Sequence, residues 1–118
     1  MNEKFIRKSS SGLNIIAVDF DGTLFEGPTE EYPIPGPPIW KTIDYVKKKI
    51  INGWTPILWT CREGSHLKIA LKKCKEYGLD FELVNENHPS IIMKENNDSR
   101  KIYATIYLDD RSINPGDL

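Results

Sequence analysis

The sequence has little of several features that would place it in large classes of protein. Only two of its 118 residues are cysteines, Cys61 and Cys74, and they lack the spacing of a thiolate zinc site. No apolar run approaches the roughly 20 residues that a membrane span needs. The first twelve residues are polar and contain no hydrophobic signal region, so we expect reduced thiols and a cytoplasmic protein.

A strong charge of either sign is absent as well. Sixteen Lys and Arg against seventeen Asp and Glu leave a formal net charge of −1, which provides no field to steer the chain toward nucleic acid or an anionic membrane. We expect the short basic run Lys47–Lys49 to be the solvated face of a helix. Internal repeats and low-complexity segments are missing too, and the length suits one core. We therefore predict a single domain at 13–118 after a flexible tail at 1–12.

Apolar strands and amphipathic helices alternate along the chain. Strands are predicted at 13–18, 54–59, 81–84 and 102–108, and helices from Pro37–Pro38 to Asn52–Gly53 and from Gly64–Ser65 to Gly78. The segment 85–99 is polar and irregular, with at most a turn of helix near 91–93. This order favours an α/β fold with a doubly wound, Rossmann-like parallel sheet of about four strands.

Acidic side chains gather where the apolar strands end. The run Asp19-Phe20-Asp21-Gly22-Thr23 follows the first strand, and Asp109-Asp110 follows the last. The carboxyl ends of parallel strands share one edge, which is where open α/β sheets bind ligands. Carboxylates this close repel each other and lose hydration, and a bound Mg²⁺ would compensate them. An Asp-Gly turn with both acids in water is the alternative for the first pair.

Two further residues complete a pattern: Thr60 follows the second strand, and Lys101 stands just before the last one. In this order the residues resemble the four motifs of the haloacid dehalogenase superfamily of phosphotransferases. Those motifs are D-x-D-G-T, a Thr or Ser after a strand, a Lys, and a terminal D-D or G-D. The resemblance covers Ile15 to about Ile113, nearly the whole chain.

The resemblance implies a fold as well. The sheet should have the strand order 4-1-2-3, so that the first and fourth strands are neighbours. The cap domain that many members carry should be missing, because neither Leu24–Gly36 nor Asn85–Ser99 is long enough to fold as a domain. We expect the Pro-rich loop Leu24–Gly36 to cover an otherwise open site, unless a second subunit of a homo-oligomer does so.

The resemblance also implies catalytic and metal-binding roles for the acids. Asp19 would be the nucleophile that forms an aspartyl-phosphate, and Asp21 the general acid and base. Mg²⁺ would be held by Asp19, the Asp21 region with its backbone carbonyl, Asp109 and Asp110. Alignment with the G-D form makes Asp110 the direct ligand, and Asp109 would act directly or through water.

Four more residues would bind the phosphate of the substrate. Thr60 would donate its hydroxyl to a phosphoryl oxygen, and Lys101 would neutralise the phosphoryl group. Gly22 and Cys61 complete this set. Lys101 is the motif lysine by its place before the last strand, and two nearby residues are alternatives: Arg100 and Lys94. We place Arg62 at the rim of the site, where it either reaches substrate or pairs with Glu63.

The implied function is a Mg²⁺-dependent phosphate monoester hydrolase acting on a small phosphorylated molecule or a phosphorylated macromolecule. A 5′-nucleotidase-type member is the alternative, because short members of that type also end the last motif with D-D-R, here Asp109-Asp110-Arg111. Two non-catalytic alternatives are a phosphate-binding module of the same fold and a receiver-like phosphoacceptor. A receiver needs its lone acceptor Asp on the middle strand, where this chain has Thr60.

Overall fold

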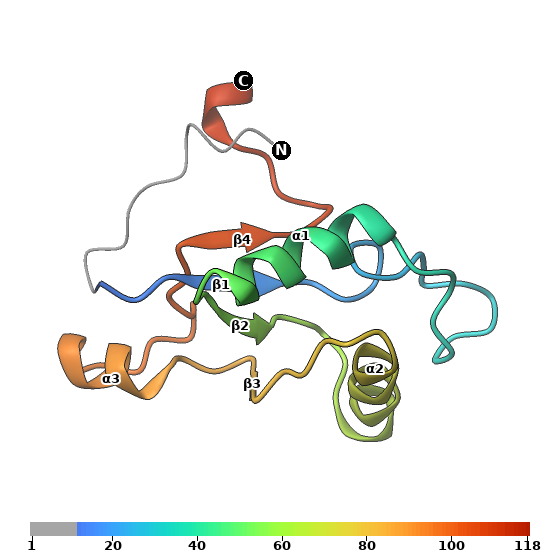
Figure 1. Ribbon diagram of the computed structural model, residues 1–118, viewed down its shortest axis with the longest axis horizontal. Coiled ribbons are helices and arrows are strands. Elements are labelled where there is room, and N and C mark those ends of the chain that lie inside the picture. Colours follow the sequence, from blue (N-terminus) through green and yellow to red (C-terminus); the bar gives the residue numbers. More distant parts are fainter. Residues whose placement is uncertain (1–11) are drawn as a thin grey trace.

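The computed structural model describes residues 12–118, so the predicted tail at 1–12 lies outside the described residues except for Gly12. Strands and helices alternate as the pattern predicts (Figure 1). The elements in chain order are β1 (Ile15–Val18), α1 (Trp40–Ile51), β2 (Thr55–Leu58), α2 (Gly64–Glu76), β3 (Leu83–Val84), α3 (Pro89–Glu95), β4 (Ile106–Leu108) and the 3₁₀-helix η2 (Pro115–Asp117). The prediction of an α/β fold is confirmed.

The strands form one parallel sheet in the order β3-β2-β1-β4, which from the other edge is 4-1-2-3. The central strand β1 is hydrogen-bonded to β2 on one side and to β4 on the other. Val18 at its end is level with Leu58 of β2 and Leu108 of β4. The residues that follow these three strands therefore emerge together at one edge of the sheet, and the strand order reverses between β1 and β4.

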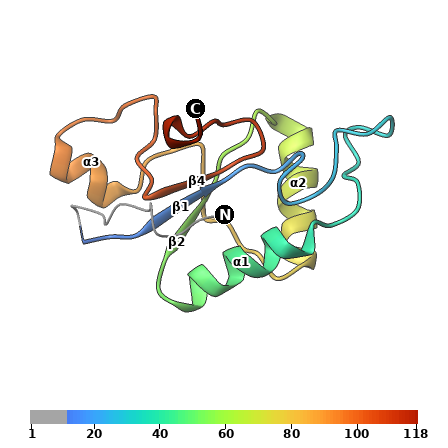
Figure 2. The same ribbon diagram turned by 90° about the horizontal axis from the view of Figure 1, so that it is seen from above.

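Helices cover both faces of the sheet (Figure 2). On one face Ile16 and Val18 pack with apolar side chains of α1 and α2, and on the other Ile15 and Ala17 pack with Ile91 of α3. All four β1 residues are buried, which explains why this strand is a continuous apolar run rather than an alternating one.

The second half of the chain departs from the predicted elements. Strand β4 begins at Ile106 rather than at 102, because side chains take over the hydrogen bonds of the preceding backbone. Tyr103 donates its N–H to Asn87 Oδ1, and the Thr105 hydroxyl accepts the N–H of Ile15. The other predicted strands are also shorter than expected at their ends, β3 having only Leu83–Val84.

Helix α3 has seven residues where only a turn of helix was predicted. It begins with Pro89 in the first turn, and the His88 ring accepts the N–H of Ser90 at 3.0 Å. The buried Asn87 ties the flanking segments together, because its amide donates to Asp98 and to the Ser99 carbonyl, both at 3.1 Å. The hydrogen bonds of the Asn87 side chain thus fix the ends of a segment whose sequence shows no regular pattern.

Within residues 12–118 the longest helix, α2, has 13 residues, and no helix there has the length and apolar character to cross a membrane.

Candidate metal and phosphate site

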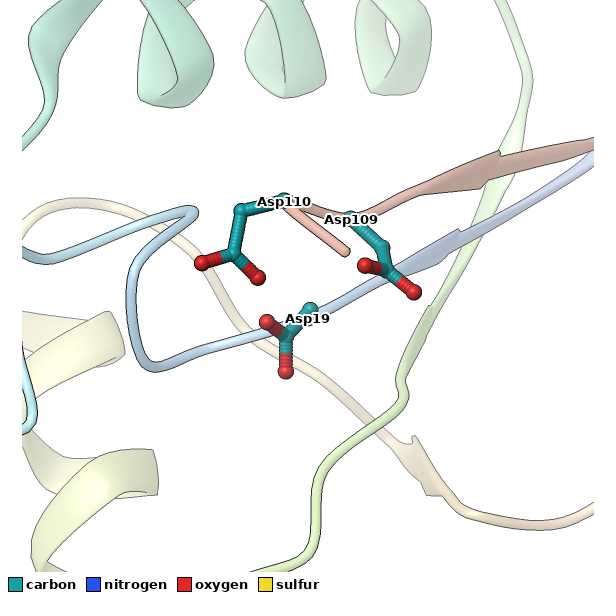
Figure 3. Close-up of side chains that lie close together, drawn as sticks. All are labelled: Asp19, Asp109 and Asp110. Atoms are coloured by element: carbon teal, nitrogen blue, oxygen red, sulfur yellow. The ribbon is translucent and has the colours of Figure 1, made fainter. Parts of the chain in front are cut away.

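Three carboxylates meet at the edge where β1 and β4 end. Oxygens of Asp19, Asp109 and Asp110 all lie within 4.8 Å of one another. Figure 3 shows Asp19 after β1, and Asp109 and Asp110 after β4, with their carboxylates gathered round one space. None of the three forms an ion pair with a Lys or Arg of residues 12–118. We call these three residues the acid cluster.

Local backbone structure holds the two acids of β4 in place. The Asp109 carboxylate accepts the N–H of Arg111 and, at 3.1 Å, the hydroxyl of Ser112. Asp110 lies against Gly22, where an added Cβ would meet Asp110 Oδ2 at 2.3 Å. Gly22 also has a φ of +82°, so this position favours glycine on both counts. The glycine of the D-x-D-G-T run thus leaves room for the carboxylate of Asp110.

The electrostatic environment disfavours three ionised carboxylates without a cation. The pKa of Asp19 is raised to about 6, chiefly by burial and also by the charges of Asp110 and Asp109, against the lowering effect of hydrogen bonds from the Thr23 hydroxyl and at the Phe20 backbone. The Thr23 hydroxyl donates to Asp19 Oδ2 at 3.1 Å. Two like charges 4 Å apart repel by about 1 kcal/mol in water and about 4 kcal/mol near a protein surface. A cation in the cluster would remove this repulsion.

The donor set fits Mg²⁺. Its atoms are carboxylate oxygens, which are hard ligands, and a few carboxylates together with water and phosphate are what Mg²⁺ commonly uses. Gly22, which has no side chain, leaves room for the carboxylate of Asp110 in this donor set.

The Asp21 side chain, in contrast, lies outside the acid cluster. Its two oxygens accept hydrogen bonds from Arg62 Nε at 2.8 Å and Nη2 at 2.9 Å. The Asp21 carboxylate is therefore not a member of the acid cluster, and the part of Asp21 in the metal site through its backbone carbonyl stays a prediction. In the present conformation the guanidinium of Arg62 thus occupies both oxygens of this carboxylate.

Arg62 is the residue that sequence reasoning placed wrongly. It is only 3% exposed rather than at the rim, and its partner is Asp21 rather than Glu63. The pKa of Arg62 is raised, chiefly by the hydrogen bonds to Asp21. The position of Arg62, two residues after Thr60, could have indicated this pairing, because a side chain there can turn back to the edge of the sheet where β1 ends.

The residues predicted to bind phosphate differ in whether their hydrogen-bond donors already have a partner in the protein. Thr60 is held by Asn85, whose side chain accepts the Thr60 N–H at 2.8 Å and donates to the Thr60 carbonyl at 2.7 Å. The Thr60 hydroxyl accepts the Arg62 N–H at 3.1 Å and keeps its own proton for another acceptor. Cys61 is exposed, and the Gly22 N–H donates to Phe25. Asn85 was missed, because its role depends on β3 lying beside β2.

The structure does not bring Lys101 to the acid cluster. Its ammonium lies 5.4 Å from the centre of the Tyr107 ring. Within residues 12–118 neither Lys101 nor Arg100 forms an ion pair with the cluster, and Lys94 lies on α3. The phosphate-binding role of the lysine stays a prediction that requires the side chain to move.

One sizeable hollow lies away from the acid cluster. It is an open groove of about 650 Å³ between α1 and β4, rimmed by three lysines: Lys41, Lys48 and Lys49. A second hollow of about 320 Å³ lies beside α3 and includes Lys101. No acid of the cluster lines either of these two hollows.

The predicted covering loop is an ordered hairpin. Its arms are joined by Glu26 N–H to the Pro37 carbonyl at 2.8 Å and by Gly36 N–H to the Glu26 carbonyl at 3.1 Å. The base is anchored in the core through the buried Phe25, whereas Tyr32 near the tip is 42% exposed. We call residues 24–38 the hairpin.

Fold and site together define an α/β protein with a carboxylate cluster at the switch point of a parallel sheet. Among solved structures the chain is similar to a conserved protein coded by a locus of Bacteroides thetaiotaomicron. The two are 35% identical, with a TM-score of 0.71, over 86% of this chain and 78% of that one. The chain belongs to the same family as that protein, which is described only as conserved. No family model and no curated protein matches the chain.

Proposed function

We propose that the protein is a Mg²⁺-dependent phosphate monoester hydrolase of the haloacid dehalogenase type. The observation that carries the proposal is the acid cluster, three carboxylates with oxygens within 4.8 Å of one another and no ion-pair partner among residues 12–118. A site built this way attracts a divalent cation, and a cation at the end of β1 attracts a phosphate. Thr60, at the end of the neighbouring strand, retains a hydroxyl proton for that phosphate.

In the proposed reaction an oxygen of Asp19 attacks phosphorus while the bond to the ester oxygen breaks. The products of this step are an aspartyl-phosphate and an alkoxide, which takes a proton from Asp21. A water molecule then attacks the aspartyl-phosphate and gives its proton to Asp21, which releases inorganic phosphate and restores Asp19. The hydroxyl of Thr23 orients Asp19 by its bond to Oδ2, and Thr60 donates to a phosphoryl oxygen.

Asp19, Asp109 and Asp110 would hold the Mg²⁺, with the Asp21 backbone carbonyl as a further oxygen in our prediction. Bound there, the ion neutralises charge so that an anionic phosphate can approach the carboxylates. Arg62 and Lys101 do not do this in the described conformation, since the guanidinium of Arg62 is committed to Asp21 and the ammonium of Lys101 lies over Tyr107.

The test is hydrolysis of p-nitrophenyl phosphate with Mg²⁺, with EDTA, and with Asp19→Asn as the matched inactive variant. We expect turnover only in the first case. Activity that persists in EDTA would exclude the metal, and activity of Asp19→Asn would exclude the nucleophile. A panel of sugar phosphates, mononucleotides and phosphorylated peptides then identifies the substrate, with 5′-mononucleotides as the named alternative.

A second candidate function is phosphate binding without turnover. The observation that favours it is the position of Lys101 away from the acid cluster. Wild-type protein that binds inorganic phosphate in the presence of Mg²⁺ but hydrolyses no ester of the panel would establish this function instead.

A further inference from the structure

We propose that Arg62 is a positioning residue that fastens the hairpin to Asp21, so that Asp21 and the hairpin move as one unit. The catalytic part of this inference rests on the proposed function, whereas the fastening itself does not. Nothing in the residue pattern around Arg62 required such a role, and three separate segments of the chain converge on its side chain.

All three nitrogens of the Arg62 guanidinium are engaged. Nε and Nη2 bind the two oxygens of Asp21, and Nη1 donates to the Pro33 carbonyl at 2.8 Å and to the His66 carbonyl at 3.2 Å. The guanidinium carbon also lies over two aromatic rings, 4.8 Å from the Phe20 centre and 4.7 Å from that of Tyr32. A side chain with four hydrogen bonds and two ring contacts is highly constrained.

The contacts of Arg62 join the base of the hairpin to its tip. Asp21 pairs with Phe25 through a backbone bridge at the base, and Pro33 and Tyr32 belong to the far part of the hairpin. A second link lies beside the first, because the Tyr32 hydroxyl is 3.2 Å from His66 Nδ1 at the start of α2. The tip has little apolar burial of its own, with Tyr32 and Ile34 exposed by 42% and 56%. Polar and stacking contacts with Arg62 and His66 are therefore what hold the tip.

Lysine cannot replace arginine in this role. Its ammonium is a single charge that cannot bind both oxygens of Asp21 side by side, nor place a planar group over Phe20 and Tyr32. Arg62→Lys thus keeps the charge and removes the fastening, which makes it the informative variant. The exposed pair of Lys73 and Glu76, 3.2 Å apart on α2, provides the matched control through Lys73→Gln.

The first test is amide hydrogen exchange in the hairpin, which requires no catalytic activity. The N–H groups of Tyr32, Ile34 and Gly36 donate to Thr29, Glu31 and Glu26 within the hairpin and report its opening. In Arg62→Lys we expect these amides to exchange at least about tenfold faster while those of α1 keep their rates. Lys73→Gln should change none of them. Unchanged hairpin exchange in Arg62→Lys would overturn the proposal.

Should Arg62→Lys fail to fold, Tyr32→Ala serves the same purpose. This variant removes one ring contact and the hydroxyl contact with His66, at a residue that is already partly exposed. Faster exchange at Ile34 and Gly36 supports fastening through this cluster, and unchanged exchange refutes it.

The second test separates positioning from a purely structural role. In Arg62→Lys we expect kcat to fall more for an alkyl phosphate than for p-nitrophenyl phosphate, with little change in KM, because Asp21 serves both substrates as base but only the poor leaving group also needs its proton. The double variant Asp21→Asn with Arg62→Lys should be no slower than Asp21→Asn alone. Losses that multiply, or equal losses on both substrates, contradict the positioning role. A wild-type protein without activity refutes the proposed function but leaves the exchange test decisive for the fastening.

Discussion

The acid cluster and the Asp21–Arg62 pair begin two positions apart in the sequence, at Asp19 and Asp21, and differ in how their charge is balanced. Asp19 lies with Asp109 and Asp110 and has only the Thr23 hydroxyl and a backbone group at Phe20 to favour its ionised form. Asp21 has a buried guanidinium bound to both of its oxygens. The Asp19 carboxylate therefore has no cationic partner among residues 12–118, whereas the Asp21 carboxylate has one.

This difference separates the part of the sheet edge that can bind a cation from the part that stabilises the fold. An uncompensated cluster is a poor way to stabilise a fold but a ready site for a cation. A compensated pair with contacts to three segments ties structure together and offers no vacant ligand position. The same two-residue spacing thus places one carboxylate toward β4 and the other toward the hairpin and α2.

The largest expected effect is on turnover by the acid cluster. Asp19→Asn should reduce kcat by about 10³-fold or more, since removal of one member of a catalytic unit typically costs that much or more. The circular dichroism spectrum should stay that of the wild type, because amide and carboxylate have nearly the same shape. Steady-state kinetics with p-nitrophenyl phosphate measure the effect, and a variant that keeps a tenth of wild-type kcat would rule out Asp19 as nucleophile.

The next prediction compares how the Asp21–Arg62 pair and the acid cluster contribute to the stability of the fold. Arg62→Ala should lower the free energy of unfolding by about 3–5 kcal/mol, because it leaves Asp21 without its partner and removes the contacts with two aromatic rings. The partial exposure of Asp21 places the expectation at the lower end of this range. In metal-free protein Asp110→Ala should have the opposite sign and raise stability slightly, as repulsion falls. Urea unfolding monitored by tryptophan fluorescence measures the unfolding free energy of both variants. If both substitutions change it in the same direction, the proposed difference between the pair and the cluster is wrong.

Loss of a metal ligand should be visible in the Mg²⁺ requirement. Asp110→Ala should raise the Mg²⁺ concentration for half-maximal activity at least about tenfold, since loss of even an outer-shell partner can weaken metal binding by that factor. Glu95→Ala on α3, away from the cluster, is the control. Activity titrated against Mg²⁺ gives the answer, and an unchanged requirement in Asp110→Ala would place the metal elsewhere.

The smallest effect is a pH dependence of stability in metal-free protein. The pKa of Asp19 is raised from 3.8 to about 6 in the folded state, so between these values the folded chain binds more protons than the unfolded one. Stability should therefore fall as pH rises through this window, by about 1 kcal/mol after allowance for the partial exposure of Asp19. Thermal unfolding between pH 4 and pH 7 measures it as an order-of-magnitude effect. Asp19→Asn or saturating Mg²⁺ should flatten the curve, and a curve that is equally steep in Asp19→Asn would assign it to other groups.

The first half of the chain was predictable nearly residue by residue. The buried run before Asp19 and the helical spacing of Ile43 and Val46 are local patterns, and β1 and α1 occupy the places these patterns indicate. The second half was less so. Strand β4 lost its first predicted residues, because Asn87 and Thr105 compete with the sheet for backbone hydrogen bonds. Helix α3, which His88 caps, is longer than the predicted turn. Such competition depends on segments that meet only after folding.

The sequence by itself determined the alternation of strands and helices and the placing of Asp19, Thr60 and Asp109–Asp110 at strand ends. These features depend on periodicity and on the shared edge of parallel strands, which neighbouring residues largely decide. Only the tertiary structure decided which charges meet. It placed Asp110 against Gly22, paired Asp21 with a buried Arg62, and left Lys101 over Tyr107. Coulombic and hydrogen-bond partners are set by distances of a few ångström between remote segments, and a linear pattern does not contain those distances.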